Sequence, residues 1–391
     1  MSYKYAVVGA GRQGIAAAYD LVMFGDAAHV SFIDVNAETA RAAAQRINSL
    51  VARPVADSAQ ADARDTTRLR ELFTGCQAIL SAAHYAVNLG ITDLAVAMGL
   101  HMVDLGGHTG VVRQQQGRDG AARFAAVTVV PDCGMGPGLN VSLAAYAAGQ
   151  FDTPREVRIW DGGLPQDPQP PWNYSSTFAM SGLTNEYDGS AYFLRDGAIV
   201  EVPCFADLEE LDFAPPIGRL EAFVTSGGLS TAPWTWAGTL KVLENKTLRY
   251  PGHCAMFTAF QQLGLLGLDP IEAGGVTIVP RDVLHALLEP RIGVSAGVVK
   301  DVCVMRVVGT GDRDGRPGRF TVELVDRYDE GTGFTAMQRL TGWHAAIVLG
   351  LAVRGQLPAG VRSVESVPGA IIVSESRRRG WHMTELFESG R

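Results

Sequence analysis

The sequence predicts a two-domain α/β protein, in which a doubly wound parallel sheet is followed by an α+β domain built on an antiparallel sheet. Strands and helices alternate in the first third of the chain, which is the order that produces a parallel sheet. From about residue 155 onward the pattern changes to short alternating strands separated by turns. We therefore expect one domain in residues 1–132, a second in 133–333, and a helix and tail in 334–391 that return to the first.

Composition narrows the classes of function. The chain has 391 residues, a net charge of −8 and no long stripe of Lys and Arg, which argues against nucleic acid or an anionic membrane as a partner. Its longest helical apolar stretch, residues 345–353, is far shorter than the ~20 residues that cross a bilayer. Five widely spaced cysteines without metal-ligand spacing predict free thiols, no metal site and a cytoplasmic location. The Arg377–Arg379 run is interpreted as a solvated face.

The N-terminal segment reads as a strand, a glycine turn and a helix. The turn matches G-x-G-x-x-G with Gly9, Gly11 and Gly14, and a second strand ends in Asp34, twenty residues after Gly14. This spacing is the fingerprint of a dinucleotide-binding, Rossmann-type fold. Gly9 permits the tight turn, Gly11 lets the backbone approach a pyrophosphate, and Gly14 lets the helix lie against the sheet. The helix N-terminus then attracts the phosphates.

The carboxylate that follows the second strand favours NAD over NADP. Asp34 is placed to accept hydrogen bonds from the adenosine ribose, and a 2′-phosphate at roughly 4 Å from it would cost about 4 kcal/mol at an effective dielectric constant of about 20. Neither Val35 nor Asn36 supplies a cation that offsets this repulsion. Arg12 and Gln13 complete the turn, and we expect Arg12 to contact the pyrophosphate. A plain tight turn without a ligand is the alternative.

Further along the first domain, "CQAILSAAHY", "HMVDLGG" and "VTVVPDCGMG" read as three buried strands, with helices around residues 67–73 and 89–98. Ligands of doubly wound sheets lie beyond the carboxyl ends of the strands, where small residues let a nicotinamide ribose lie close. This rule selects as candidates Ala82, Ala83, His84 and Tyr85 after one strand, Asp104 and His108 after the next, Asp132 after the third, and, at the adenosine end, Asp62.

The second domain is predicted from "REVRIWDGG", "AIVEVP", "LEAFVTSGG", "KDVCVMRVVG" and "RFTVELVDRYD", the last two joined by a hairpin tip whose arginines are expected to be solvated. Residues 165–171 hold four prolines, and an ordered arm over the site is favoured over a linker because Trp172 and Tyr174 follow directly. In the tail, residues 334–355 predict a helix with one broad apolar face, on which His344 is interpreted as a core residue.

The segment "LENKTLRYPGHCAMF" concentrates cationic side chains in an acidic chain. A guanidinium is the usual bidentate partner of a carboxylate, so we expect Arg249 to hold the α-carboxylate of an amino-acid substrate. An internal ion pair with a carboxylate such as Glu221 or Glu244 is the alternative. The further candidates for substrate binding are Lys246, His253, Thr225 and Ser226. His253 either caps the helix that follows it or holds substrate.

Five ordered motifs, "DCGMGPGLNVSLAAY", "DGGLPQDPQPPWNY", "LEAFVTSGGLSTAPWTWAGTL", "KTLRYPGH" and "DVLHALLEP", together resemble the saccharopine dehydrogenase-like family, and within it the lysine 6-dehydrogenase branch. The resemblance spans nearly the whole chain. It implies NAD-dependent oxidative removal of the ε-amine of L-lysine. The products would be ammonia, NADH and 2-aminoadipate 6-semialdehyde, which cyclises to piperideine-6-carboxylate. The resemblance also implies a homodimer or a higher homo-oligomer.

The implied reaction needs a neutral amine, because hydride leaves the ε-carbon only when the nitrogen can donate electrons. A lysine amine has a pKa near 10.4, and neutralising it at pH 7 costs roughly 4 to 5 kcal/mol. Burial and a general base could meet this demand. The candidate bases are Asp104, His108 and Asp132, with Tyr85 as a positioning donor. Two alternatives stay open: a saccharopine-type enzyme acting on a secondary amine, and a non-catalytic NAD-binding sensor.

Overall fold

The structure, a computed structural model, describes residues 2–293 and 299–390. The chain forms two compact units. The first contains the chain up to Gln150, together with Ser230–Thr235 and Gln338–Trp381; the second contains Phe151–Leu229, Trp236–Met337 and the chain from His382. The first boundary lies after residue 150 instead of after residue 132, because helix α7 (Leu139–Ala148) belongs to the first unit.

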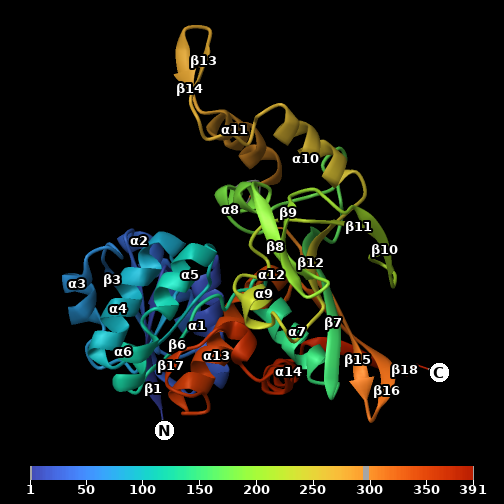
Figure 1. The fold of residues 1–391 in the computed structure, drawn as a ribbon. Helices are drawn as coiled ribbons and strands as arrows, with labels where there is room; N and C mark the ends of the chain where they lie inside the picture. Colours follow the sequence, from blue (N-terminus) through green and yellow to red (C-terminus); the bar gives the residue numbers. More distant parts are fainter. Residues whose placement is uncertain (1, 294–298, 391) are drawn as a thin grey trace. The chain divides into compact units, whose positions relative to one another are not determined.

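The first unit is built on a seven-stranded parallel sheet (Figure 1). Its strand order is β17-β6-β5-β4-β1-β2-β3, and every neighbouring pair is parallel. The order reverses between β1 and β4, so the switch point of the doubly wound sheet lies at their carboxyl ends. This confirms the predicted fold class. The strands are β1 (Tyr3–Val8), β2 (Ala27–Asp34), β3 (Ala56–Gln60), β4 (Ala78–Ser81), β5 (His101–Asp104), β6 (Thr128–Val130) and β17 (Gly360–Val361).

Helices surround this sheet. They are α1 (Arg12–Phe24), α2 (Ala37–Val51), α3 (Thr66–Leu72), η1 (Tyr85–Val87), α4 (Asn88–Met98), α5 (Thr109–Gln116), α6 (Asp119–Phe124), α7, η3 (Arg339–Trp343), α13 (His344–Val353), η4 (Val364–Ser366) and α14 (Gly369–Arg378). The predicted tail helix is present as η3 and α13, and both pack against α1. Residues 344–352 are all buried, so this helix is apolar on every side rather than on one face.

The tail divides between the two units. We expected all of residues 334–391 to return to the first domain, but β18 (His382–Ser389) pairs antiparallel with β16 of the second unit. The physical reason is that β18 supplies backbone hydrogen-bond partners to the outer edge of β16, which would otherwise be unpaired.

A nine-stranded sheet forms the centre of the second unit. Its main path is β10-β11-β12-β7-β15-β16-β18, with β8 paired to β12 and β9 paired to β8. The sheet is mixed rather than wholly antiparallel, because β7 and β12 pair in parallel. The strands are β7 (Thr153–Pro165), β8 (Ser190–Arg195), β9 (Ala198–Pro203), β10 (Glu209–Phe213), β11 (Gly218–Phe223), β12 (Val242–Arg249), β15 (Asp301–Arg313), β16 (Arg316–Arg327) and β18.

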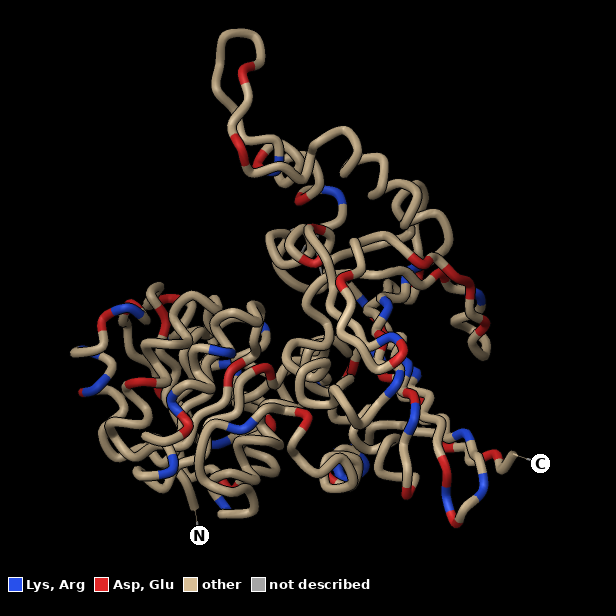
Figure 2. Tube along the Cα trace, viewed as in Figure 1, with Lys and Arg blue, Asp and Glu red and all other residues tan. Residues whose placement is uncertain are grey.

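Three helices of the second unit, α8 (Met180–Glu186), α10 (His253–Gln262) and α11 (Pro280–Ile292), bury an aromatic cluster with Phe223 of β11. A small hairpin of β13 (Ile271–Ala273) and β14 (Val276–Ile278) extends beyond α11 (Figure 1). Along both units Lys and Arg are interspersed with Asp and Glu (Figure 2). In the parts of the chain that the structure describes, no helix has the length and apolarity needed to cross a bilayer.

Candidate functional site

The glycine turn joins β1 to α1 at the switch point of the parallel sheet. Gly9 has a φ of +96°, and a Cβ at this position would lie 2.7 Å from the backbone of Ala82. A Cβ on Gly14 would lie 2.1 Å from the carbonyl oxygen of Gly9, so only glycine lets α1 start this close to β1. A Cβ on Gly11 would meet no described atom within 4 Å. The outer side of the turn is therefore open to a ligand.

Asp34 ends β2 and is tied to the same turn. Its Oδ2 accepts a hydrogen bond from the backbone N–H of Ala10 at 2.9 Å, and its Oδ1 accepts one from Asn36 at 2.9 Å. Each oxygen keeps a lone pair for a ribose hydroxyl. The N-cap residue of α1 is Gly11, which has no side chain to cap the first turn. A carboxylate beside an open, uncapped helix N-terminus fits the ribose and pyrophosphate of a dinucleotide.

The remaining predicted cofactor residues lie along the same edge of the sheet. Arg12 and Gln13 are the first residues of α1, and Ala82 and Ala83 follow β4 directly against Gly9. The position of these four residues agrees with a nucleotide that lies across the ends of β1 and β4.

His84 and Asp62 are engaged locally. The Nδ1 atom of His84 accepts a hydrogen bond from the backbone N–H of Ala86 at 3.3 Å and so caps η1. Asp62 follows β3 and forms an ion pair with Arg64 at the surface. The hydrogen bond from the Arg64 side chain lowers the pKa of Asp62 to about 2.

Asp104, at the end of β5, organises the loop that follows. Its Oδ1 accepts hydrogen bonds from the backbone N–H groups of Gly106 at 2.8 Å and Asp132 at 3.2 Å, and its Oδ2 accepts one from Gln115 at 2.7 Å. The side chain is fully buried, and burial raises its pKa. These three bonds make Asp104 an anchor of the loop, and they leave it a weaker candidate for the general base.

Asp132 is the better candidate. It is 2% exposed, and its Oδ2 accepts a hydrogen bond from the hydroxyl of Ser230. Burial first, and then the charge of Asp104, raise the pKa of Asp132 to about 7. A buried carboxyl group with this pKa can take up and release a proton near neutral pH. Sequence reasoning missed Ser230, which belongs to the short segment Ser230–Thr235 of the first unit although its chain neighbours belong to the second.

Glu365 is a further carboxylate that the sequence analysis missed. It is 5% exposed, and its Oε1 accepts hydrogen bonds from the hydroxyls of Thr231 at 3.0 Å and Thr235 at 2.5 Å. Within the described residues its buried Oε2 has no hydrogen-bond partner. Because Ser230 and Thr231 are adjacent, the segment Ser230–Thr235 binds both Asp132 and Glu365. The negative charge of Glu365 contributes to the raised pKa of Asp132.

His108, which precedes α5, and Tyr85, which begins η1, form an aromatic pair. Their ring centroids lie 5.1 Å apart in a stacked arrangement, and the Tyr85 ring also lies 4.0 Å from that of His84. His108 is exposed, whereas Asp104 is buried and bonded to Gln115 and the backbone. Asp104 therefore bonds to Gln115 of α5 and to the backbone of the loop rather than to His108.

Arg249 ends β12 in the second unit and is 3% exposed. Its Nε donates to the hydroxyl of Tyr187 at 3.0 Å, its Nη1 donates to the carbonyl of Leu248 at 2.9 Å, and its Nη2 lies 3.9 Å from a carboxylate oxygen of Glu186. The guanidinium also lies 4.8 Å from the ring centroid of Tyr174, a cation–π distance. The arm after residue 171 therefore contacts Arg249 of its own chain.

The carboxylates named as internal partners of Arg249 bind elsewhere. Glu221 accepts hydrogen bonds from Gly252 at 2.9 Å and from Cys254, at the start of α10. Glu244 pairs with Arg195 at 2.8 Å. Lys246 pairs with Glu209 at 2.8 Å, on the opposite face of β12 from Arg249 because side chains alternate along a strand.

His253 begins α10 and is 3% exposed. Its Nε2 lies 2.7 Å from the hydroxyl of Tyr187, while its buried Nδ1 has no hydrogen-bond partner in the described part of the chain. Burial, and then the charge of Arg249, lower the pKa of His253 well below its ordinary value. The imidazole is therefore neutral at pH 7.

Thr225 and Ser226 bond within the protein. The hydroxyl of Thr225 lies 2.6 Å from that of Thr247, and the hydroxyl of Ser226 donates to the carbonyl of Asn185 at 2.8 Å. These contacts hold the segment after β11 to β12 and to α8.

Two family models match the chain. Residues 5–130 match the saccharopine dehydrogenase NADP binding domain, and residues 134–375 match the saccharopine dehydrogenase C-terminal domain. The chain belongs to the saccharopine dehydrogenase family. The family resemblance that the five motifs indicated is thus confirmed. This member of the saccharopine dehydrogenase family is an oxidoreductase that acts on an amino acid.

The fold is shared with a solved structure of a saccharopine dehydrogenase. The saccharopine dehydrogenase family member is similar to the apo histidine-tagged saccharopine dehydrogenase (L-Glu forming) from Saccharomyces cerevisiae, with 18% identity, a TM-score of 0.79, and coverage of 99% of this chain and 100% of that one. It is also similar to a probable dehydrogenase from Thermotoga maritima, with 11% identity, a TM-score of 0.43, and coverage of 99% and 98%.

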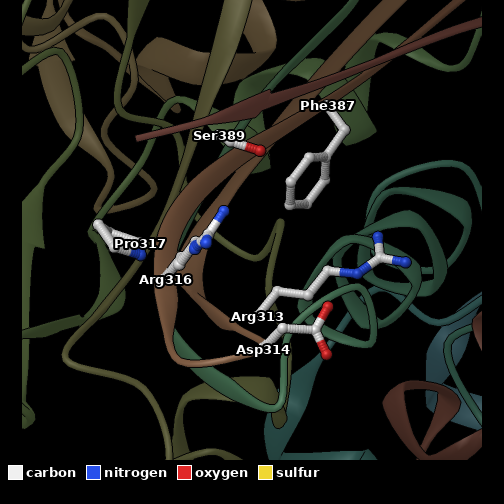
Figure 3. Close-up of a pocket in the computed structure, with 6 residues that line it drawn as sticks. All are labelled: Arg313, Asp314, Arg316, Pro317, Phe387 and Ser389. Carbon is white, nitrogen blue, oxygen red and sulfur yellow. The ribbon is translucent and has the colours of Figure 1, made fainter. Parts of the chain in front are cut away.

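A surface pocket of about 430 Å³ lies in the second unit at the tip of the β15–β16 hairpin (Figure 3). The guanidinium of Arg313 lies 5.0 Å from the ring centroid of Phe387 there. The arginines of the tip are exposed, as predicted. The pocket is lined by Arg313, Asp314, Arg316, Pro317, Phe387 and Ser389, which include no residue of the candidate site.

Proposed function

We propose that this family member is an NAD-dependent lysine 6-dehydrogenase, which removes the ε-amine of L-lysine and forms 2-aminoadipate 6-semialdehyde, ammonia and NADH. The observation that carries the proposal is Arg249. This buried guanidinium is positioned by Tyr187 and Tyr174, and the carboxylate of Glu186 lies 3.9 Å away, beyond hydrogen-bond distance. A positioned guanidinium of this kind suits the α-carboxylate of an amino-acid substrate.

Asp132 is our proposed general base. Its raised pKa, about 7, lets it accept a proton from the ε-ammonium group, whose nitrogen must be neutral before the ε-carbon can lose a hydride. The hydroxyl of Ser230 holds the carboxylate in place during this transfer. When bound, NAD accepts the hydride from the ε-carbon. After Asp132 has released the first proton to solvent, it accepts a proton from the water that adds to the substrate iminium, and loss of ammonia then leaves the aldehyde.

The cofactor preference rests on Asp34. The family description names NADP, but a carboxylate at the end of β2 repels a 2′-phosphate and binds a free 2′-hydroxyl. Arg12 is the first residue of α1, directly after the glycine turn, and we propose that it contacts the pyrophosphate. NAD is therefore our proposed cofactor. We also propose that the enzyme acts as a homodimer or higher homo-oligomer in the cytoplasm, which light scattering and fractionation would test.

The second candidate is a saccharopine-type dehydrogenase, favoured by the two family models, whose descriptions name saccharopine dehydrogenase. Saccharopine also carries amino-acid head groups, so Arg249 suits both substrates. The yeast enzyme is only 18% identical to this chain, so the similarity shows the fold alone.

A substrate panel tests the proposal. Pure protein is incubated at mildly alkaline pH with NAD or NADP and L-lysine, D-lysine, L-ornithine or saccharopine, and NADH or NADPH absorbance is followed. We expect turnover with L-lysine and NAD, poor turnover with NADP and none with D-lysine. Turnover of saccharopine without turnover of L-lysine would establish the second candidate. Cofactor binding without turnover of any substrate would indicate a sensor.

A further inference from the structure

One face of the nine-stranded sheet carries a set of polar side chains inside the aromatic cluster. Thr247 of β12 lies opposite Asp161 of β7 and also opposite Phe223 of β11. Residues that face each other across a sheet share one side of it, and so do residues two apart on a strand. Asp161, Thr247, Arg249 and Phe223 therefore lie on the same face, and α8, α10 and α11 pack on this face at Phe223.

Two carboxylates accompany Arg249 on this covered face. Asp161 is 6% exposed, and its Oδ1 accepts a hydrogen bond from Asn245 at 2.6 Å. Glu186, at the end of α8, approaches Arg249 to 3.9 Å and is about one third exposed. Burial raises the pKa of Asp161 to about 6, while Asn245 and then Arg249 oppose the rise. Burial raises the pKa of Glu186. The positive charge of Arg249 opposes this rise, and the negative charge of Asp161 adds to it.

The net charge of this group is negative when both carboxylates are ionised, so the group can accommodate one more cation. Arg249 contributes one positive charge, Asp161 and Glu186 contribute two negative charges when ionised, and His253 is neutral because burial lowers its pKa. A carboxylate bound to Arg249 would add a further negative charge. Buried carboxylates are stable only when a cation or several donors compensate them, so a ligand carboxylate at Arg249 requires a positive group close to Asp161 and Glu186.

An unfilled donor beside Arg249 independently indicates a ligand. The hydroxyl oxygen of Tyr187 accepts from Arg249, so its own proton is available to the Nε2 of His253, 2.7 Å away. This arrangement leaves Nδ1–H of His253 as a donor, buried and without a partner among the described residues. Buried donors are rarely left unsatisfied. A carboxylate oxygen of a bound ligand would satisfy it.

We propose that this face recognises the head group of an α-amino acid, with Asp161 and Glu186 binding its α-ammonium group beside the α-carboxylate held by Arg249 and His253. The inference rests on the proposed function for the role of Arg249, and it names the part of the substrate that the two acids select. It predicts that substrates need both head-group charges. Cadaverine, which lacks the carboxylate, and 6-aminohexanoate, which lacks the α-amine, should both be poor substrates.

Calorimetric titration of protein saturated with NAD tests this site without turnover. The probes are L-norleucine, which has both head-group charges and no ε-amine, and hexanoate, which lacks the α-ammonium. We expect wild-type protein to bind L-norleucine more tightly than hexanoate. Asp161→Asn, which keeps an oxygen for Asn245, should weaken L-norleucine binding at least ~10-fold and leave hexanoate binding unchanged or tighter. Asp314→Asn, at an exposed turn of the same unit, is the matched control.

Three results would overturn the inference: wild-type protein that does not bind L-norleucine, an Asp161→Asn variant that binds both probes as wild type does, or one that loses both equally. If Asp161→Asn does not fold, as judged by circular dichroism, Glu186→Gln should show the same selective loss with a smaller magnitude, because that side chain is partly exposed. Discrimination between the probes without lysine turnover would overturn the proposed function alone. Lysine turnover without an Asp161 effect would overturn this inference alone.

Discussion

The two polar sites, one in each unit, hold buried charge in opposite ways. In the first unit the hydrogen bonds to Asp104, Asp132 and Glu365 come from neutral groups, namely hydroxyls, an amide side chain and backbone N–H groups. In the second unit carboxylates and phenols gather around the cation Arg249. Carboxylates held by neutral donors keep a proton that can be transferred, whereas a guanidinium stays charged and binds an anion. The first site suits proton transfer and the second suits recognition.

The strongest test of this contrast replaces the proposed base. Asp132→Asn should lower kcat by about 10²- to 10⁴-fold, because an amide cannot take the proton and general-base catalysis contributes a factor of this size. Steady-state NADH formation with L-lysine measures the effect. Ser230→Ala, which removes only the positioning hydroxyl, is the milder companion variant. A kcat of Asp132→Asn within a factor of three of wild type would assign the base elsewhere.

Removing the cation of the second site should affect binding instead of chemistry. Arg249→Ala should raise KM for L-lysine roughly 30- to 5,000-fold, because the head group loses a buried charged partner. This change corresponds to a loss of about 2 to 5 kcal/mol of binding free energy. Lys246→Ala is the matched control, since Lys246 lies on the other face of β12 and pairs with Glu209. If Arg249→Ala raised KM no more than Lys246→Ala does, the role of Arg249 would be in the fold and not in substrate binding.

Asp34 is the carboxylate of the first unit that we propose binds the cofactor ribose, so replacing it tests whether ligand recognition also occurs in that unit. Asp34→Arg should shift the NADP/NAD ratio of kcat/KM toward NADP by roughly 10- to 100-fold, below the limit set by about 4 kcal/mol of repulsion. Asp62→Asn, whose parent residue pairs with Arg64, should leave the ratio unchanged. An unaltered ratio in Asp34→Arg would contradict the ribose assignment.

The smallest expected effect concerns the pH profile. As the proposed general base, Asp132 acts only when deprotonated, so kcat/KM should rise with pH through about 7. Glu365→Gln removes a negative charge that raises the pKa of Asp132, so its acidic limb should move to lower pH, by up to about 1 unit. Glu330→Gln, at an exposed surface ion pair, is the control. An identical limb in Glu365→Gln would exclude coupling between the two carboxylates.

The same pKa makes a prediction about stability. Since folding raises the pKa of Asp132, its contribution to stability is complete below the ordinary value of 3.8 and is lost as the pH rises toward about 7. Replacing Glu365 by Gln should reduce this loss. Urea unfolding at pH 4 and pH 8 measures it, and a loss equal to that of wild type would contradict the coupling.

Sequence reasoning worked best where a rule concerns neighbours in the chain. The glycine turn and Asp34 were placed correctly because the spacing of strand, turn and helix sets the backbone path, and the close approach of Gly14 to Gly9 requires glycine. Asp132 was selected as a candidate because parallel strands bring their carboxyl ends to one edge. The parallel pairing of β7 with β12 was missed, since short alternating strands look the same in either direction.

The sequence pattern did not predict which residues are the partners of buried charges. Ser230 lies 98 residues from Asp132, and Thr231 lies 134 residues from Glu365, so no local pattern connects them. The Arg377–Arg379 run was interpreted as solvated, yet Arg379 is buried in an ion pair with Asp20, 359 residues away. That part of the prediction was wrong.

Local spacing, then, already dictates the nucleotide turn, the order of strands and helices, and the presence of a cation before α10, because these depend on backbone geometry within a few residues. Folding decides which buried charges face each other, because a side chain removed from water takes as its partner whichever distant segment packs against it. The pKa of Asp132 and the surroundings of Arg249 are consequences of that packing.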